Sequence, residues 1–410
     1  MIRSMLLAAL LALGSVPLLG ATPARAADDP LALQRRSPGQ VTVMTQNQYI
    51  GADLAPLLNA SSPVALNDAV LEMLRQAAAN RFVDRVQRQA RQIVLRQPDL
   101  VGLQEVFYLG CRDLPPRRGA CADPSIAPAF LDQLAATMTA LQAAGGDYEV
   151  AARVVNFDLR EILAEIPGLG QLGGVPFTID GRLGLLTAYD QDVILKRRFV
   201  ATQPVRFPGC RRSAQGCNYR AQAGIRLPIT GQNTGLGVKR GFVAVDAALL
   251  GRTYRFVNTH LEVRPALRGN ASGAVIQAAQ ARELLAALGN APMAASRALI
   301  VVGDFNSSPA DTAPAPVVTP YAQFVAAGFV DAWQRAFPTG QGFTCCQAAD
   351  LRNERSLLYE RIDPIFARPP VLVQAVRLDG RRDVAKTGSA DDADRLWPSD
   401  HAGVTAQLKY

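Results

Sequence analysis

Histidine and tryptophan are both scarce in this sequence, with two residues of each among 410. The six cysteines form no C-x-x-C pair, and neither His260 nor His401 lies near a cysteine in the sequence. This spacing argues against a structural zinc site. Beyond the first 26 residues, no apolar run is long enough to cross a bilayer, which argues against an integral membrane protein.

The first 26 residues have the pattern of a secretory signal peptide. Arg3 gives a positive start, Met5 to Leu19 is apolar but too short to span a membrane, and Ala24-Arg25-Ala26 forms a small-x-small cleavage site. We therefore expect residues 1–26 to be removed and residues 27–40 to form an N-terminal extension. The mature protein is expected to be soluble and secreted or periplasmic.

An exported chain should carry its cysteines as disulfides. Two pairs each flank a short loop and are predicted to close it locally: Cys111 with Cys121, and Cys210 with Cys217. Cys345 and Cys346 are adjacent, and the sequence leaves two arrangements open for them. They either form a disulfide with each other or exchange partners with another pair.

Basic residues are concentrated in one part of the chain. The formal net charge is +8, and arginines and lysines crowd into residues 196–240. Such a segment suits an anionic substrate, and we expect Arg211, Arg212 and Arg220 to bind phosphate groups. The alternative is that these arginines form an ordinary solvated face.

One stretch combines a buried strand with polar residues at its end. Leu299 to Val302 is aliphatic, Gly303 ends the run, and Pro309 prevents the strand from continuing. Asp304 and Asn306 follow the strand two residues apart, where a carboxylate and a carboxamide can bind a hard cation or orient a water. Taken alone, the same pattern also fits an ordinary Asp-Asn turn.

Other polar residues stand at the ends of predicted strands in the same way. Four residues follow such strands and three precede them: Asn47, Glu105, His260 and Asp304 follow, and Asp363, Asp400 and His401 precede. In a largely antiparallel sheet, the ends of some strands and the starts of others share one edge, so we expect these side chains to meet at one mouth.

Residues 41–410 are predicted to form one domain that carries long loops. No internal repeat or linker divides it, and insertions are expected near residues 107–128, 156–182 and 204–240. Apolar residues recur at helical spacing from Val64 to Arg96, which predicts one long helix there.

Six stretches resemble, in order, the motifs of the endonuclease/exonuclease/phosphatase superfamily. They are Gln46-Asn47, Pro98–Glu105, Asn258-Thr-His260, Gly303-Asp-Phe-Asn306, Arg361-Ile-Asp363 and Ser399-Asp-His401. The superfamily includes deoxyribonucleases, abasic-site endonucleases, inositol-polyphosphate phosphatases and neutral sphingomyelinases. The resemblance implies an α/β fold, a four-layer α/β/β/α sandwich in which two mixed, largely antiparallel sheets are flanked by helices.

The resemblance also implies a metal site. Glu105 would be the principal Mg²⁺ ligand, with Asn47 and Asp400 beside it, and Mn²⁺ would be an alternative metal. Phosphodiester hydrolysis brings an anionic nucleophile to an anionic centre, so a cation and protonated imidazoles have to neutralise the accumulating charge.

Catalytic roles follow from the same resemblance. Asp304 and Asn306 would orient the attacking water or a second metal, and His401 would act as general base or acid. His260, held by Asp363, would contact the phosphate. A carboxylate against a ring nitrogen raises the pKa of an imidazole and fixes its tautomer.

Three interpretations of the function are open. The first is an exported Mg²⁺-dependent phosphodiesterase, with a nuclease favoured because the basic segment can follow a phosphate backbone. The second is a sphingomyelinase or phospholipase C-like enzyme acting on membrane lipid, or a phosphatase. Lipid enzymes need exposed aromatic residues, which are few here, although the apolar stretch Ile162–Ile179 keeps this interpretation open. The third is a non-catalytic binding module, which the intact set of motif residues argues against.

Overall fold

The computed structural model describes residues 37–164, 170–226, 228, 235–264, 273–291, 297–313 and 315–410. The predicted signal peptide and most of the predicted N-terminal extension lie outside these residues. Within them, no helix combines the length and the apolar composition that crossing a membrane requires.

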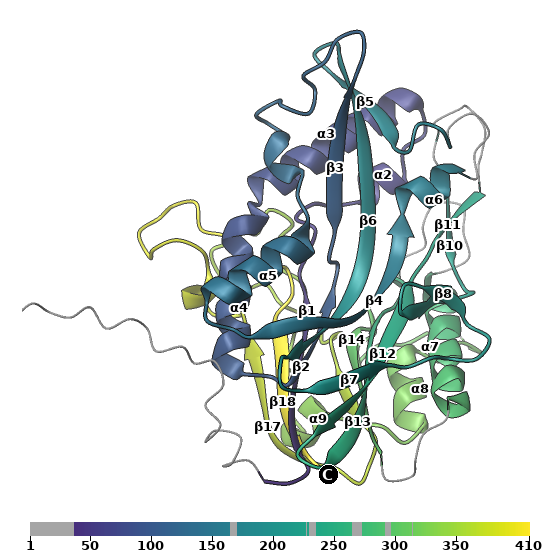
Figure 1. The fold of residues 1–410 in the computed structure, drawn as a ribbon, viewed down its shortest axis with the longest axis vertical. Helices are drawn as coiled ribbons and strands as arrows, with labels where there is room; N and C mark the ends of the chain where they lie inside the picture. The colour runs from purple at the N-terminus through teal and green to yellow at the C-terminus, as the bar shows by residue number, and fades with distance from the viewer. Residues whose placement is uncertain are drawn as a thin grey trace, which may run out of the picture.

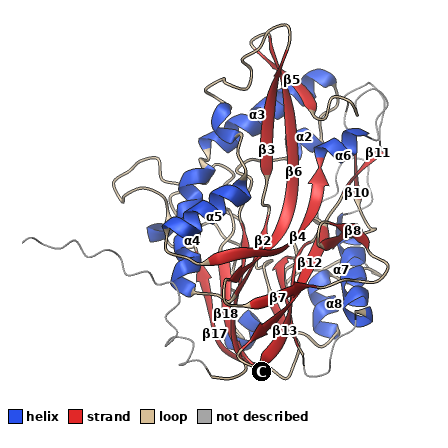
Figure 2. Cartoon of the chain, in the orientation of Figure 1, coloured by secondary structure: helices blue, strands red, loops and turns tan. Residues whose placement is uncertain are grey.

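Two large sheets form the centre of the molecule (Figures 1 and 2). In the first sheet the strand order is β17-β18-β1-β2-β6-β3, and β4 and β5 also pair with β6. Its strands are β1 (Gln40–Asn47), β2 (Leu100–Gln104), β3 (Tyr108–Leu114), β4 (Tyr148–Asp158), β5 (Val175–Ile179), β6 (Arg182–Arg197), β17 (Leu372–Asp379) and β18 (Gly403–Lys409). β1 and β2 run in parallel, whereas the other described pairs of this sheet are antiparallel.

The second sheet has the order β15-β16-β14-β13-β12-β9-β8, with β7 paired to β12. Its strands are β7 (Ala201–Pro204), β8 (Arg211–Ser213), β9 (Gly216–Asn218), β12 (Gly241–Leu249), β13 (Arg252–His260), β14 (Ala298–Asp304), β15 (Val330–Asp331) and β16 (Ile365–Ala367). Here β13 and β14 form the parallel pair. A separate hairpin consists of β10 (Ala223–Arg226) and β11 (Gly235–Val238).

Helices cover the outer faces of both sheets. They are α2 (Ala55–Leu58), α3 (Pro63–Ala79), α4 (Phe82–Arg96), α5 (Gln133–Ala143), α6 (Leu159–Ala164), α7 (Gly273–Asn290), α8 (Pro320–Ala326) and α9 (Ala332–Ala336), with short 3₁₀ turns at Ala127–Ala129 and Asp383–Ala385. α4 and α5 lie on one side of the molecule and α7 and α8 on the opposite side (Figure 1). The four-layer sandwich with two mixed, largely antiparallel sheets is therefore confirmed.

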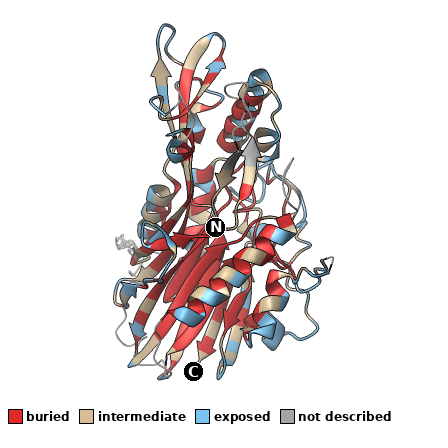
Figure 3. Ribbon diagram, turned by 90° about the vertical axis from the view of Figure 1, so that its right-hand side faces the viewer, coloured by how far each residue is buried: buried red, intermediate tan, exposed pale blue. Residues whose placement is uncertain are grey.

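The layers follow from the two-residue period of the strands. In β1, Val43 packs between the two sheets, whereas its neighbour Met44 packs against the helices outside. In β14, Ile300 faces the first sheet and Val301 faces α7 and α8. The central strands are consequently buried on both faces (Figure 3), and an apolar run such as Leu299–Val302 of β14 fits this position.

The single helix predicted from Val64 to Arg96 is wrong. The chain forms α3 and α4, separated by Asn80 and Arg81, and Arg81 adopts the left-handed region with φ 37°. The side-chain Nδ2 of Asn80 donates to the carbonyl oxygens of Gly51 and Ala349 (both 2.8 Å), so contacts with distant loops stabilise the break. Helical periodicity reports the buried face of both helices and does not record this interruption.

The described parts of the predicted insertions are built into the fold. Near residues 156–182, the side chains of Ile162, Val175 and Phe177 are buried in a core cluster. The segment near residues 204–240 adds β8 and β9 to the edge of the second sheet. The apolar stretch that had kept a lipid enzyme in consideration therefore packs inward in its described part.

The predicted disulfides Cys111–Cys121 and Cys210–Cys217 are confirmed. Cys345 and Cys346, for which two arrangements were open, form a disulfide with each other. The structure describes all six cysteines, and none of them is free.

Candidate active site

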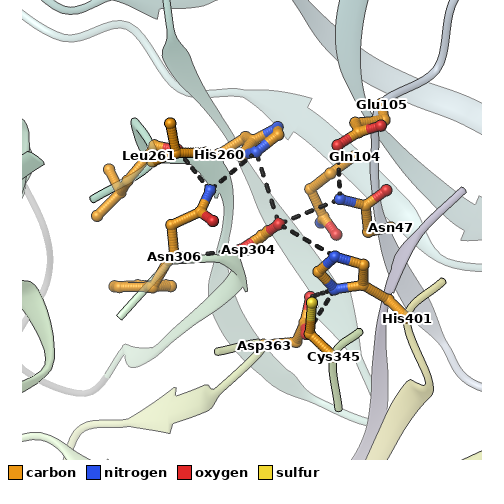
Figure 4. Close-up of polar contacts among 12 residues, drawn as sticks. Asn47, Gln104, Glu105, His260, Leu261, Asp304, Asn306, Cys345, Asp363 and His401 are labelled. Carbon is orange, nitrogen blue, oxygen red and sulfur yellow. Dashed lines mark hydrogen bonds and ion pairs between the residues drawn. The ribbon is translucent and has the colours of Figure 1, made fainter. Parts of the chain in front are cut away.

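The ends of both parallel strand pairs meet at one edge of the sandwich (Figure 4). Asn47 ends β1 beside Gln104 of β2, and His260 ends β13 beside Asp304 of β14. A hydrogen bond of 3.1 Å from Asn47 Nδ2 to Asp304 Oδ2 joins the two edges. The sequence prediction that these side chains share one mouth is correct in its geometry.

Asn47 links two carboxylates at the centre of this mouth. Its Nδ2 donates to Glu105 Oε1 as well as to Asp304, each at 3.1 Å, and its Oδ1 accepts from the Tyr49 amide at 2.9 Å. The Ile50 amide also faces Glu105 Oε2 at 3.3 Å. Glu105 adopts φ 53°, a left-handed conformation that costs energy outside glycine and therefore often marks a functional position.

His401 is held by Asp363. The ring Nδ1 lies 2.9 Å from Asp363 Oδ2 and 3.1 Å from Oδ1, and Nε2 faces Asp304 Oδ2 at 3.8 Å. Burial opposes a charged ring, but the carboxylates of Asp363, Asp400 and Asp304 outweigh this effect and raise the pKa of His401 well above its usual value. The surrounding carboxylates therefore favour the protonated ring, and its Nε2 faces Asp304.

The expectation that Asp363 holds His260 is wrong. β14 lies between β13, which ends in His260, and β16, which follows Asp363. The strand that carries Asp304 thus separates the two residues, and the Asp363 carboxylate meets His401 from the other side. Sequence motifs give the order of these residues but not the order of their strands in the sheet.

His260 is held by Arg240, which the sequence analysis counted only among the basic residues. Arg240 Nη1 lies 3.0 Å from His260 Nδ1, and because a guanidinium only donates, Nδ1 must accept. Burial and the Arg240 charge lower the pKa of His260 well below its usual value. The ring is consequently neutral, and the acceptor role of Nδ1 places its proton on Nε2, which lies 3.5 Å from Asp304 Oδ2 and 3.3 Å from Asn306 Nδ2.

Arg240 could have been found from its position in the sequence. It directly precedes Gly241, which lies opposite His260 in the antiparallel pair of β12 and β13. When one strand ends in a histidine, a cation at the start of the antiparallel neighbouring strand can reach the histidine ring.

Two buried acids that sequence reasoning missed lie behind Arg240. Asp190 and Asp192 alternate on β6 and so share one face. Asp190 Oδ2 accepts from Asn156 Nδ2 (3.2 Å) and lies 3.9 Å from Arg240 Nη1. Burial raises the pKa of Asp190 to about 6, and burial together with Asp190 raises that of Asp192 well above its usual value. The signal was two carboxylates spaced two residues apart directly before the apolar run Val193–Leu195.

The three arginines predicted to bind substrate do not reach the mouth. Arg211 and Arg212 are exposed on β8, the edge strand, and β9 and β12 separate them from His260. Arg220 is also exposed, and its guanidinium donates to the Gly209 carbonyl oxygen at 3.1 Å. All three lie on the same side of the second sheet as β8, where a long substrate could still contact them.

The sequence profile of the Endonuclease/Exonuclease/phosphatase family matches residues 57–401. The chain belongs to this family. As a member of the Endonuclease/Exonuclease/phosphatase family, it is a phosphoester hydrolase, and such hydrolases are typically dependent on a divalent metal. No curated protein sequence matches the chain significantly.

Solved structures of similar fold come from several organisms. A family member from Beutenbergia cavernae is 21% identical, with a TM-score of 0.43, and the match covers 90% of this chain and 71% of that one. A mannosyl-6-phosphatase from Bacteroides thetaiotaomicron is 17% identical, with a TM-score of 0.49 and coverage of 90% and 100%. D. rerio TDP2 in complex with a single-stranded DNA product is 16% identical, with a TM-score of 0.46 and coverage of 90% and 99%.

The donor set at the mouth fits the divalent metal of an Endonuclease/Exonuclease/phosphatase enzyme. Glu105 and Asp400 are both partly exposed carboxylates, the ligands that Mg²⁺ prefers. Burial, with a smaller contribution from the Glu105 charge, raises the pKa of Asp400 to about 6. Asn47 Oδ1 accepts one hydrogen bond and keeps a second lone pair. These three residues would hold the ion.

A second set of potential ligands lies beside them. Oxygen or nitrogen atoms of Asp304, Asp363 and His401 lie within 4.8 Å of one another. The Asp363 carboxylate already binds Nδ1 of His401, and the His401 ring carries a positive charge. A cationic imidazole repels a metal ion, so this set fits proton transfer and charge neutralisation better than metal binding.

Proposed function

We propose that the protein is an exported Mg²⁺-dependent phosphodiesterase that cleaves its substrate by in-line attack of water, with nucleic acid as the favoured substrate. The observation that supports this proposal best is the arrangement of charge at one mouth. The carboxylates of Glu105 and Asp400 stand near the imidazolium of His401 and the neutral ring of His260. A bound divalent cation would polarise a phosphoryl oxygen and neutralise part of its charge.

His401 would act on the side of the phosphate where negative charge accumulates. Its Nε2 proton is free to point into the mouth because Asp363 binds Nδ1. A positioned imidazolium can stabilise a charged phosphoryl oxygen or give its proton to the leaving oxygen. Asp363 keeps the ring oriented and favours its protonated form before the reaction.

Asp304 would orient and deprotonate the attacking water. Its carboxylate is buried, and burial together with the Asp363 charge raises its pKa to about 7. A carboxylate with this pKa is a suitable base near neutral pH. The backbone N–H of Asn306 donates to Asp304 Oδ1 at 2.8 Å and fixes the orientation of the carboxylate.

His260 would donate a hydrogen bond to the phosphate without exchanging a proton. Arg240 occupies Nδ1, so the neutral ring presents only Nε2–H toward the mouth. This differs from the role of His401, which is a cation. The two histidines of the chain would thus both contact the phosphate, His401 as a protonated ring and His260 as a neutral ring.

A nucleic acid is favoured over a lipid because of what the surface of the described residues offers. Arg211, Arg212 and Arg220 are exposed on the side of β8, where they can contact a phosphate backbone that extends from the mouth. By contrast, the described apolar residues of the stretch Ile162–Ile179, such as Phe177, are buried in the core rather than offered to a bilayer.

Export is supported by the cysteine chemistry. All six cysteines are paired in disulfides, which form and persist in oxidising compartments. The apolar start of the sequence suits a signal peptide.

A hydrolysis panel tests the proposal. The purified mature protein would be incubated with plasmid DNA, RNA, sphingomyelin, phosphoinositides and a phosphomonoester, each with Mg²⁺ and with EDTA. We expect Mg²⁺-dependent cleavage of DNA or RNA, and none by His401→Ala. Hydrolysis of sphingomyelin or of the monoester alone would contradict the proposed substrate.

The arginines provide a second test of the nucleic-acid substrate. Neutralising Arg211, Arg212 and Arg220 together should weaken turnover of DNA more at low salt than at high salt, because phosphate contacts are screened by counterions. Hydrolysis of the small diester bis(p-nitrophenyl) phosphate should not change. An equal loss at both salt concentrations, or no loss, would indicate that these arginines form a solvated face.

A further inference from the structure

A short segment, residues 344–347, connects the two members of the catalytic dyad. At one end, Thr344 Oγ1 accepts a hydrogen bond from the Asp363 amide (3.3 Å). At the other end, the Gln347 amide donates to Asp400 O (2.9 Å), the carbonyl that precedes the catalytic histidine. The segment therefore contacts the backbone on both sides of the Asp363–His401 pair.

The cysteines in the middle of this segment lie against the histidine itself. Cys345 forms isolated β-bridges with both Glu360 and His401. The two sulfur atoms and a ring nitrogen of His401 all lie within 4.8 Å of one another. Figure 4 shows the Cys345 side chain next to Asp363 and the imidazole ring. The other two disulfides bear no such relation to a catalytic side chain among the described contacts.

The disulfide makes this packing compact. Bonded sulfur atoms lie about 2 Å apart, whereas two thiols can approach each other only to roughly 3.5 Å or more. Cys345 is buried, with 2% of its surface exposed, so separated thiols have little free space on the side of His401. A disulfide between neighbours also closes a ring through one peptide bond, which restricts the backbone that joins Thr344 to Gln347.

We infer that the Cys345–Cys346 disulfide is a positioning element for the His401–Asp363 pair, and that full turnover requires its oxidised form. This inference rests on the proposed function, because it concerns the aim of the proposed catalytic histidine. Breaking the bond would let the two sulfur atoms separate against the ring, and a small displacement of a catalytic group lowers the rate strongly. The effect would fall on kcat rather than on substrate affinity.

The redox step needs a reductant of the dithiol class. A thiolate of the dithiol attacks one sulfur of the pair, and the partly exposed Cys346 is the accessible one. The S–S bond breaks, a mixed disulfide forms, and the sulfur of Cys345 leaves as a thiolate that takes up a proton. The second thiol of the reductant then attacks the mixed disulfide. The protein gains two electrons and two protons, and the dithiol becomes a cyclic disulfide.

Two cysteine variants of the mature protein test this inference by kinetics. Cys345→Ser/Cys346→Ser removes the positioning disulfide, and Cys210→Ser/Cys217→Ser is the matched control, which removes a local disulfide on the second sheet. With bis(p-nitrophenyl) phosphate and Mg²⁺, we expect kcat to fall about tenfold or more in the first variant, with KM within about threefold. The control should retain kcat within about twofold. A folded first variant with normal kcat, or an equal fall in both, would overturn the inference.

Reduction of the control variant covers the case in which the Cys345→Ser/Cys346→Ser variant fails to fold. Mild dithiothreitol should lower kcat of the control variant by the same factor, and reoxidation should restore it, while the melting curve still shows folded protein. Full activity that persists in the reduced, folded protein would equally overturn the inference.

The histidine spectrum separates this inference from the proposed function. The chain contains only two histidines, so ¹⁵N-labelled imidazoles give two sets of ring signals, which His260→Gln assigns. Reduction should shift the ring signals of His401 and leave those of His260 unchanged. If the wild type hydrolyses no phosphodiester, the proposed function fails, but this spectrum still decides whether the disulfide positions the ring. Unchanged His401 signals on reduction would contradict it.

Discussion

Glu105 and His401 carry opposite charges in the same mouth, so their substitutions should differ in metal dependence. Glu105→Gln keeps the shape but loses the charge that holds Mg²⁺, and some activity should return at high Mg²⁺ or with Mn²⁺. His401→Ala removes a proton donor whose contribution is typically about 10²–10⁴ in rate. Added metal cannot replace it, so the loss should persist at every metal concentration.

The measurement is kcat against Mg²⁺ concentration for the wild type and both variants, with melting curves as a control for folding. Neither side chain lies in the apolar core, so both variants should stay folded. Near-normal turnover in either variant, or equal rescue of both by metal, would show that these roles are assigned wrongly.

Arg240 sets the tautomer of His260, and its replacement should therefore act on catalysis. Arg240→Met keeps much of the apolar stem but removes the donor to Nδ1, so the proton of the neutral ring can move to the wrong nitrogen. We expect kcat on a small diester to fall by about 10²-fold with little change in KM. Arg240→Lys should recover part of the loss because an ammonium can also donate.

The control for this variant is Arg381→Met, which removes an exposed arginine outside the site. If Arg240→Met raises KM tenfold while kcat stays normal, Arg240 binds substrate directly instead of positioning His260. Either outcome is read from initial rates over a range of substrate concentrations.

At the level of single residues, the sequence predicted which residues form the site more reliably than it predicted which residue binds each histidine. Strand ends and motif order were enough to bring Glu105, Asp304 and His401 together. The partner of each histidine depends on which strands lie side by side, and this order is not written in local sequence. That is why Asp363 was assigned to the wrong histidine and Arg240 was missed.

At the level of elements, one side chain ties the two sheets together directly below the site. Asn258 of β13 donates through Nδ2 to the carbonyl oxygens of Leu103 (2.9 Å) and Val193 (3.0 Å) in the first sheet. Its Oδ1 accepts from Gln104 Nε2 at 2.6 Å. Gly102 makes room for this contact, since a Cβ there would lie 2.7 Å from Asn258 Oδ1.

Asn258→Ala should accordingly destabilise the fold. The substitution leaves two buried carbonyl oxygens and one buried amide without this partner, and each such group costs about 1–3 kcal/mol. We expect a loss of roughly 3 kcal/mol or more in the free energy of unfolding, measured by urea denaturation. Asn290→Ala, at an exposed position at the end of α7, is the matched control. A loss below about 1 kcal/mol would show that water replaces the amide.

Elements with strong periodic patterns were predictable, whereas those that depend on distant contacts were not. Strand β14 follows directly from the aliphatic run Leu299–Val302. The break between α3 and α4 depends on loops more than 250 residues away for one of its hydrogen bonds, since Asn80 bonds to Ala349. The residues near Asn80 in the sequence give no information about a hydrogen-bond partner as distant as Ala349.

Over the whole molecule, the charge distribution reverses between surface and interior. The chain carries a formal net charge of +8, yet acidic groups gather in the buried centre around Asp190, Asp192 and Asp304. Burial raises the pKa of Asp190 to about 6 and that of Asp192 well above the 3.8 of an unfolded chain. The folded protein therefore binds more protons than the unfolded one between about pH 4 and pH 6, so its stability falls as the pH rises through this window.

Asp192→Asn should relieve this penalty because it removes the charge and keeps the shape. With EDTA present, we expect the variant to raise the free energy of unfolding at pH 8 and to change it less at pH 4, where a carboxyl group is closer to protonated in both the folded and the unfolded chain. The measurement is urea denaturation at both pH values, with the exposed Asp391→Asn as control. A variant that is less stable than the wild type at pH 8 would mean that the Asp192 carboxylate is compensated in the folded state, and the Arg240 charge acts in that direction.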